Sequence, residues 1–134
     1  MSLVTICKSF DFDAAHFLPN VPDGHKCKRL HGHTYRVEIR CEGHPTSVEG
    51  WFMDYADIAA AWAAVHGMID HRCLNEVPGL ENPTTEVLIA WMLKALNGDQ
   101  RVAPFLTSIR IYESATTWCE LTQQGLNHSG TGSP

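Results

Sequence analysis

Residues 31–41 read HGHTYRVEIRC, and the rest of the fold can be worked out from this stretch. From Tyr35 onward, apolar and polar side chains alternate, which is typical of a β-strand with one buried and one solvated face. Carried backwards, the same alternation places His31 and His33 on the buried face. Gly32 between them indicates that a backbone or a ligand passes close to the strand. The stretch therefore predicts an amphipathic strand whose buried face begins with two imidazoles.

A third histidine ends a second strand-like segment upstream. Phe10 and Phe12 alternate with polar residues and share the parity of His16. One strand ending where its neighbour begins would bring His16, His31 and His33 together. Three neutral imidazoles are a full protein ligand set for a catalytic zinc and leave a fourth position for water or substrate. The alternative is three histidines of the core or surface without a ligand, because spacing alone does not prove ligation.

The remaining segments follow the order strand, strand, helix, helix, strand, strand. The strands are expected at 3–12, 34–41, 108–113 and 117–121, and residues 50–53 are expected to be extended. One helix should run from Asp54 to about Gly67. A second should open within residues 82–86 and stop at Asn97. The apolar stripes of the two helices are Ile58, Trp62, Val65 and Ile69, and Leu88, Trp91, Met92 and Ala95. Helices inserted between strand pairs predict an α+β fold with an antiparallel sheet and helices on one face. The other face must then meet something, which favours oligomerisation.

Composition bounds the class of protein. A chain of 134 residues with 44% hydrophobic residues is one domain of ordinary size. We expect residues 1–122 to form it, and residues 123–134 to be a polar, mobile tail. The net charge of −5 argues against nucleic acid as a partner, and no apolar run approaches a membrane span. Five cysteines, an odd number, without a signal-peptide pattern predict reduced thiols and a cytoplasmic location.

Three further positions could carry chemistry. Cys27 lies in a polar loop, where a nearby cation would favour its thiolate, whereas Cys7, Cys41 and Cys119 lie in expected strands and are read as structural. Asp70 and His71 form a carboxylate–imidazole pair at a helix end, suited to acid–base work or present by accident. Glu113 ends an apolar strand face, so it either binds a ligand's N–H groups or is an exposed strand end.

Several motifs follow one another between residues 8 and 121: FDAAHFLP at 12–19, GHKC at 24–27, LHGH at 30–33, WFMDY at 51–55, IDH at 69–71, LN at 74–75 and PGLENPTTE at 78–86. In this order and spacing they resemble the 6-pyruvoyl-tetrahydropterin synthase family. Within it they are most similar to the bacterial branch of 6-carboxy-5,6,7,8-tetrahydropterin synthases of queuosine biosynthesis. Several ordered motifs are far more specific than any one of them.

The resemblance implies a role for each matching position. His16, His31 and His33 match the zinc ligands, Cys27 the catalytic thiol, Asp70 and His71 its proton-transfer partners, Glu113 the carboxylate that anchors the pterin, and Thr84, Thr85 and Glu86 the stretch that lines the pterin pocket. The implied fold is the tunnelling fold, a four-stranded antiparallel sheet with two helices on one face. The implied assembly is a homohexamer, a dimer of trimers, with sites between subunits.

The implied activity is that of a zinc-dependent lyase acting on 7,8-dihydroneopterin triphosphate. The products would be 6-carboxy-5,6,7,8-tetrahydropterin, acetaldehyde and triphosphate. Apart from the resemblance, Lys26, Lys28 and Arg29 either contact the triphosphate or are simply solvated. The three residues between Cys27 and His31 resemble the 6-carboxy branch, while Ser114 stands where the family usually has threonine.

Other readings remain open from the sequence. They are a 6-pyruvoyl-tetrahydropterin synthase, which eliminates triphosphate without losing acetaldehyde, and a pterin- or zinc-binding protein without turnover. An unrelated zinc hydrolase is disfavoured because the chain lacks a His-Glu-x-x-His motif. Imidazole ligands also suit copper, iron and nickel.

Overall fold

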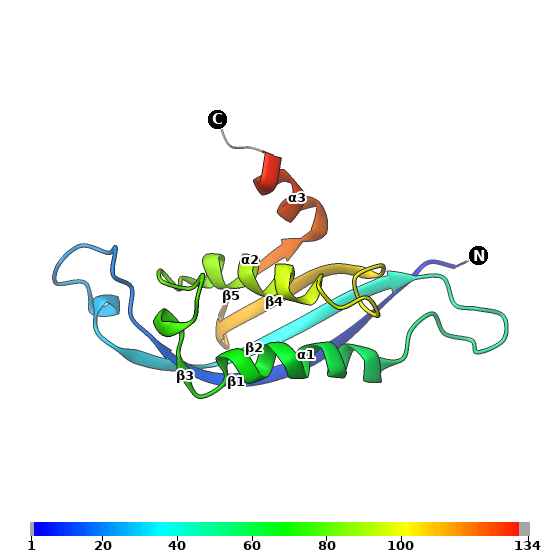
Figure 1. Ribbon diagram of the computed structural model, residues 1–134, viewed down its shortest axis with the longest axis horizontal. Helices are drawn as coiled ribbons and strands as arrows, with labels where there is room; N and C mark the ends of the chain where they lie inside the picture. Colours follow the sequence, from blue (N-terminus) through cyan, green and yellow to red (C-terminus); the bar gives the residue numbers. More distant parts are fainter. Residues whose placement is uncertain (1, 132–134) are drawn as a thin grey trace.

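A single twisted sheet forms the body of the molecule, which is described by a computed structural model covering residues 2–131 (Figure 1). Its strand order is β3-β1-β2-β4-β5. The strands are β1 (Val4–His16), β2 (His31–Gly43), β3 (Arg72–Cys73), β4 (Leu106–Ser114) and β5 (Thr117–Thr122). All neighbours pair antiparallel except β3, which runs parallel to β1. The α+β class is as predicted.

The predicted sheet of four strands is wrong by one strand. The fifth, β3, pairs with β1 only through Ala14 and Ala15. Two residues are too few to show any alternation of apolar and polar side chains, so the sequence pattern could not reveal this strand. Residues 50–53, expected to be extended, form a bend instead.

Three α-helices accompany the sheet rather than the predicted two. They are α1 (Tyr55–Ile69), α2 (Thr85–Leu96) and α3 (Gln123–Thr131), with 3-10 turns η1 (Lys26–Lys28) and η2 (Leu74–Glu76). Asp54 caps α1 through the N–H of Ala56, and Thr84 caps α2 through the N–H of Val87. Helix α3 occupies most of the segment expected to be a polar tail; residues 132–134 lie outside the described part of the chain, and the mobility of the tail stays a prediction.

The hydrophobic core lies between one face of the sheet and helices α1 and α2, which cross it side by side in Figure 1. The predicted stripe of α1 is buried in full, including Trp62, which stacks on Phe10. The stripe of α2 is rotated from the prediction, since Ile89, Leu93 and Leu96 are buried while Trp91 is half-buried. Because almost every face of α2 is apolar, periodicity alone could not select the right one.

Neither a membrane-spanning helix nor a disulfide is found among residues 2–131. Within residues 2–131, none of the helices combines the length and apolar character that a membrane crossing needs. All five cysteines are free. The end of β1 and the start of β2 meet at one end of the sheet, where the 17–30 loop connects them (Figure 1).

Candidate metal and substrate site

Strand register brings three imidazoles together at one end of the sheet. His16, the last residue of β1, lies directly opposite His31, the first residue of β2, and Ala14 lies opposite His33. The ring nitrogens of the three histidines lie within 4.8 Å of one another. His16 is only 1% exposed, and His31 and His33 are half-buried. The group could hold a metal ion.

Backbone carbonyls fix the proton positions of two of these rings. His16 Nδ1–H donates to Pro83 O at 2.9 Å, and His31 Nδ1–H donates to Arg29 O at 2.7 Å. In a neutral ring this leaves Nε2 with a lone pair, and the two Nε2 atoms face each other at 3.1 Å. Two lone pairs at this separation repel unless a cation lies between them. Tetrahedral zinc would hold two imidazole nitrogens about 3.3 Å apart, so the spacing fits such an ion.

The third ring supports the same conclusion. His33 Nε2 is buried and has no hydrogen-bond partner among the described residues. Glu113 Oε1 lies 3.4 Å from this nitrogen without forming a hydrogen bond to it. A buried polar atom without a partner is costly. A metal ion at the centre of the three rings would satisfy this nitrogen together with the other two.

Burial favours the neutral form of His16 and His33, which is the form that can bind a metal ion. Burial lowers the pKa of His16, and the neighbouring His31 and His33 lower it further, against the hydrogen bond to Pro83 O. Burial likewise lowers the pKa of His33, although the charge of Glu113 opposes this. The buried Tyr35 hydroxyl lies 3.4 Å from His16 Nδ1, and burial raises its pKa, so it stays a neutral phenol.

A polar pocket of about 320 Å³ adjoins the histidines. Glu113 connects the two, because one carboxylate oxygen lies near His33 while the other accepts a hydrogen bond from the Thr85 hydroxyl. A register shift between Tyr112 and Ser114 marks a bulge in β4 at this carboxylate, and bulges commonly re-aim a side chain. Thr85, Glu86 and Glu113 line the pocket. Thr84 instead uses its hydroxyl to cap α2.

Strand β5 contributes pocket residues that the sequence analysis did not single out. Thr117, Trp118 and Cys119 complete the lining. The Cys119 thiol, read as structural, lies at the pocket wall, and burial, together with Glu86 and Glu113, raises its pKa to about 11. The short turn between β4 and β5 was the available signal, since a tight hairpin puts the start of β5 beside Glu113.

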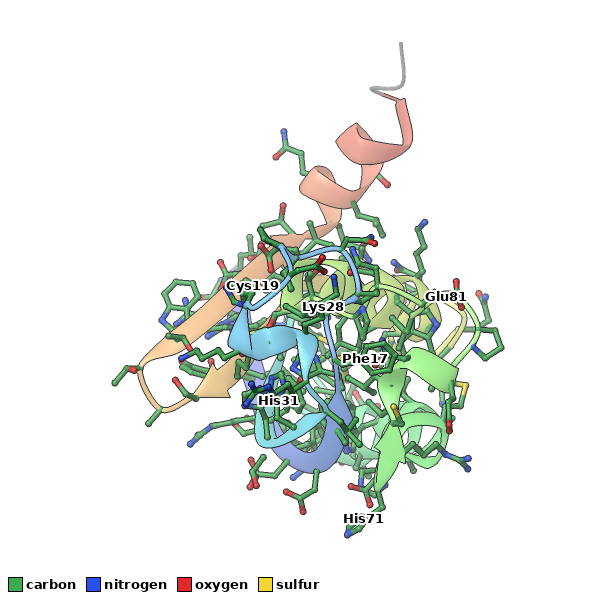
Figure 2. All side chains as sticks on the ribbon, turned by 90° about the vertical axis from the view of Figure 1, so that its left-hand side faces the viewer. Phe17, Lys28, His31, His71, Glu81 and Cys119 are labelled. Atoms are coloured by element: carbon green, nitrogen blue, oxygen red, sulfur yellow. The ribbon has the colours of Figure 1, made fainter. Side chains whose placement is uncertain are left out.

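The loop that carries Cys27 is held by its own contacts. Cys27 lies in η1, where its backbone N–H donates to His25 Nδ1 and its carbonyl accepts from the N–H of Leu18. Lys28 is paired with Asp23 at 2.6 Å. Figure 2 shows Lys28 on the same end of the molecule as His31. The half-buried Cys27 thiol thus sits on a loop that follows directly from His16 and leads directly into His31.

Asn75 anchors the start of this loop and was missed by the sequence analysis. Its side-chain oxygen accepts from the N–H of Phe17 at 3.0 Å, and its amide nitrogen donates to Phe17 O at 2.8 Å. The carboxamide therefore continues the strand pairing of β1 by one residue, immediately after His16. No local sequence signal marks this role, because the partners are 58 residues apart.

Asp70 and His71 form a second group, at the end of α1. His71 Nδ1–H donates to Asp70 Oδ2 at 2.7 Å, and the N–H of Asp13 donates to Asp70 Oδ1 at 3.0 Å. These two hydrogen bonds, that of Asp13 first, hold the pKa of Asp70 below its usual value. The hydrogen bond and charge of Asp70 raise the pKa of His71. The pair is arranged to keep a proton on an imidazole that is 76% exposed.

The structure does not merge this pair with the three histidines. Among the described residues, the ligating atoms fall into two separate clusters, one with His16, His31 and His33 and the other with Asp13, Asp70 and His71. In Figure 2, His71 projects from the rim of the molecule, away from His31. Within the described chain, the three histidines and the pocket lie together. Asp70 and His71 lie apart from them, and His71 faces outward.

Fold and site together define an α+β protein with a three-histidine group, able to hold a metal ion, beside a polar pocket. Comparison with known families gives the particular class: residues 5–124 match the family described as 6-pyruvoyl tetrahydropterin synthase. The chain belongs to this family.

Individual relatives refine the comparison. The chain is 38% identical over 117 residues to a 6-carboxy-5,6,7,8-tetrahydropterin synthase of Synechocystis, covering 84% of this chain and 88% of that protein. It is 34% identical to a dihydroneopterin monophosphate aldolase of Pyrococcus furiosus, over 68% of this chain and 76% of that protein. The solved 6-pyruvoyl tetrahydropterin synthase of Caenorhabditis elegans superposes with a TM-score of 0.85 at 24% identity, covering 91% of this chain and 96% of that one, and shows the shared fold.

Proposed function

We propose that this chain is a zinc-dependent lyase that converts 7,8-dihydroneopterin triphosphate to 6-carboxy-5,6,7,8-tetrahydropterin, with release of acetaldehyde and triphosphate, in queuosine biosynthesis. The observation that carries the proposal is the three-histidine group opening onto a pocket with Glu113 at its base. Family membership and the Synechocystis relative supply the substrate class and the reaction. A reaction of this kind belongs in the cytoplasm, as the free cysteines also favour.

His16, His31 and His33 would hold the metal, with their tautomers set by Pro83 O and Arg29 O. Bound Zn²⁺ supplies Lewis-acid polarisation of oxygen atoms on the substrate side chain. Three protein ligands rather than four favour an open, catalytic site over a closed, structural one.

Side chains of the protein would bind the pterin ring, transfer protons and contact the triphosphate. Glu113 would accept hydrogen bonds from N–H groups of the pterin ring, oriented by the Thr85 hydroxyl, with Thr84 and Glu86 shaping the start of α2 beside it. Cys27 would remove a proton from the substrate side chain, and His71, held by Asp70, would return one. Lys26 and Arg29 are the basic residues of the loop proposed to meet the triphosphate, with Lys28 already paired to Asp23.

The active assembly is proposed to be a homohexamer, a dimer of trimers. Because Asp70 and His71 face outward from their own chain, a site that uses both clusters would draw on two chains. Each site would therefore lie between subunits.

The deciding experiment is incubation of the zinc-loaded protein with 7,8-dihydroneopterin triphosphate, followed by mass analysis of the pterin and an acetaldehyde assay. A 6-carboxy product with acetaldehyde is expected, and chelation should abolish it until zinc is restored. A 6-pyruvoyl product without acetaldehyde would assign the sister activity. Turnover of the monophosphate alone would point to the aldolase reaction, and no turnover with retained pterin binding would make this a binding protein.

The metal site has a direct test of its own. We expect His33→Ala to lose tightly bound zinc, because it removes one of three ligands, whereas His44→Ala should keep it. His44 is exposed and its ring nitrogen bonds only the carbonyl of Ser2 in the described chain. Metal content after dialysis against a chelator measures the difference. Equal retention by both variants would contradict the assignment of His33 as a ligand.

A further inference from the structure

Asp13 connects the acid–base pair to the metal-binding strands. It lies in β1, three residues before His16. Its backbone N–H donates to Asp70 Oδ1 at 3.0 Å, and its carbonyl accepts the N–H of His71 at 2.6 Å. The turn that carries the acid–base pair is thus fastened to β1 by both polar backbone groups of one residue.

The carboxylate of Asp13 is held in place beside the same pair. The Thr34 hydroxyl, on the facing residue of β2, donates to Asp13 Oδ1 at 2.5 Å. A carboxylate oxygen of Asp13, one of Asp70 and a ring nitrogen of His71 all lie within 4.8 Å of one another. His71 therefore has two carboxylates within 4.8 Å, that of Asp70, which accepts from its ring, and that of Asp13, which is held by Thr34.

Two other side chains near the pair, His66 and Arg72, can carry a positive charge. His66 Nε2, on α1, lies 3.4 Å from Asp70 Oδ2, the oxygen that accepts from His71, whereas the N–H of Asp13 donates to Asp70 Oδ1. The guanidinium of Arg72, on β3, donates to the carbonyl of Gly67 at 3.3 Å. Against this background, Asp13 is a negative charge of fixed position that the proposed reaction does not yet use.

We propose that Asp13 is a positioning residue for the acid–base pair, whose carboxylate helps His71 to hold the proton that it returns to the substrate. The inference rests on the proposed function for the use of that proton, but the effect on His71 exists without any substrate. It agrees with the raised pKa of His71, to which Asp70 contributes most and the charge of Asp13 contributes further in the same direction. Thr34 holds the Asp13 carboxylate, and the Asp13 backbone holds the turn that carries Asp70 and His71.

The test is an NMR titration of the imidazole signals of the full chain, with the His71 signal assigned by its loss in His71→Gln. Asp13→Asn keeps the shape of the side chain and an acceptor for Thr34 but removes the charge. We expect it to lower the pKa of His71 by about half a pH unit at low salt, the effect of one charge about 5 Å away in water. The shift should shrink at high ionic strength, because His71 is exposed to screening ions.

Asp11→Asn is the matched control. Asp11 is an exposed carboxylate on the same strand and the same face, two residues farther from the turn, and its removal changes the net charge equally. Asp11→Asn should lower the pKa of His71 much less than Asp13→Asn does. Asp13→Glu keeps the charge and should leave the pKa of His71 close to its wild-type value. If Asp13→Asn and Asp11→Asn give the same His71 pKa, the proposal is wrong.

Turnover gives a second, separable reading. If the enzyme is active, the alkaline limb of kcat/KM should move to lower pH in Asp13→Asn by the same amount as the NMR titration, because that limb reports loss of the proton from the free enzyme's acid. An unmoved limb with a moved NMR pKa would contradict the use of that proton. Absence of turnover in the wild type would defeat the proposed function and leave the NMR result standing.

Discussion

His71 shows how one residue's backbone can hold a reactive side chain. The φ angle of His71 is 56°, in the left-handed region where the residue after a helix is usually glycine. A side chain larger than glycine's costs about 1 kcal/mol or more in this conformation. The strain is held by the hydrogen bond from its N–H to Asp13 O. The imidazole is thereby aimed back at the adjacent Asp70, a contact that a continuing helix would not allow.

The pH dependence of stability follows from the directions of the two pKa shifts. Because the folded state raises the pKa of His71, the stabilisation from its protonated form is complete below its unfolded value of 6.5 and is lost as the pH rises through the folded value. Because the pKa of Asp70 is lowered, its stabilisation is present above its unfolded value of 3.8 and is lost as the pH falls. The pair should therefore stabilise most between these two values.

We expect Asp70→Asn to destabilise the fold more at pH 5.5 than at pH 9, since the charged pair exists only at the lower of these values. Urea unfolding of wild type and variant at both pH values measures the difference. His66→Gln measures how much of the pH dependence comes from the second imidazole beside Asp70, whose Nε2 lies 3.4 Å from Asp70 Oδ2. An equal loss at both pH values would show that the charge of His71 adds nothing to the stability supplied by Asp70.

At the scale of elements, the start of α2 links stability to the pocket. Thr84 accepts the N–H of Val87, and the next two residues, Thr85 and Glu86, line the pocket. A frayed first turn would therefore loosen the hydrogen bond from Thr85 to Glu113. Capping and binding depend on the same few residues.

We expect Thr84→Ala to lower the free energy of unfolding by about 1 kcal/mol, the usual cost of losing an N-cap. It should also raise KM for the pterin more than it lowers kcat, because it disturbs the pocket rather than the proton-transfer pair. Thr84→Ser keeps the capping oxygen and should behave like wild type. Urea unfolding and steady-state kinetics measure both effects, and a stable Thr84→Ala with normal KM would contradict them.

Sequence periodicity was sufficient for the long elements but not for what joins them. The alternation after Tyr35 predicted β2 and its histidine face, and the spacing from Ile58 to Ile69 predicted α1. Two-residue β3 and the polar α3 carry too little apolar pattern to be predicted. The partners that set the site, such as Pro83 O for His16 and Asp13 for Asp70, are backbone groups, which leave no trace in residue identity.

At the scale of the molecule, the two clusters require a partner chain if both serve one reaction. In Figure 2, His31 of the three-histidine cluster and His71 lie at different parts of the molecule, and the two clusters share no residue. A mixture of two inactive variants, His33→Ala and His71→Ala, should therefore regain activity when the chains exchange. Random assortment of two chains at each interface gives about a quarter of the wild-type activity.

The control mixture combines His33→Ala with Glu113→Gln. These two residues lie 3.4 Å apart in one chain and would belong to the same half of the site, so mixing should restore nothing. Activity of co-refolded mixtures, compared with each variant alone, measures the difference. Failure of the first mixture, with exchange shown by mass spectrometry, would place the complete site within one chain.

The brevity of β3 has a consequence for how the protein behaves in solution. Because β3 covers only Ala14 and Ala15, the long outer edge of β1 from Val4 to Phe12 offers its backbone groups to another strand, as does the outer edge of β5 within the described chain. Any copy that docks there binds the folded chain and not the unfolded one, so mass action adds to its stability. With copies docked there, the melting temperature would depend on the protein concentration as well as on the sequence, and dilution would lower it.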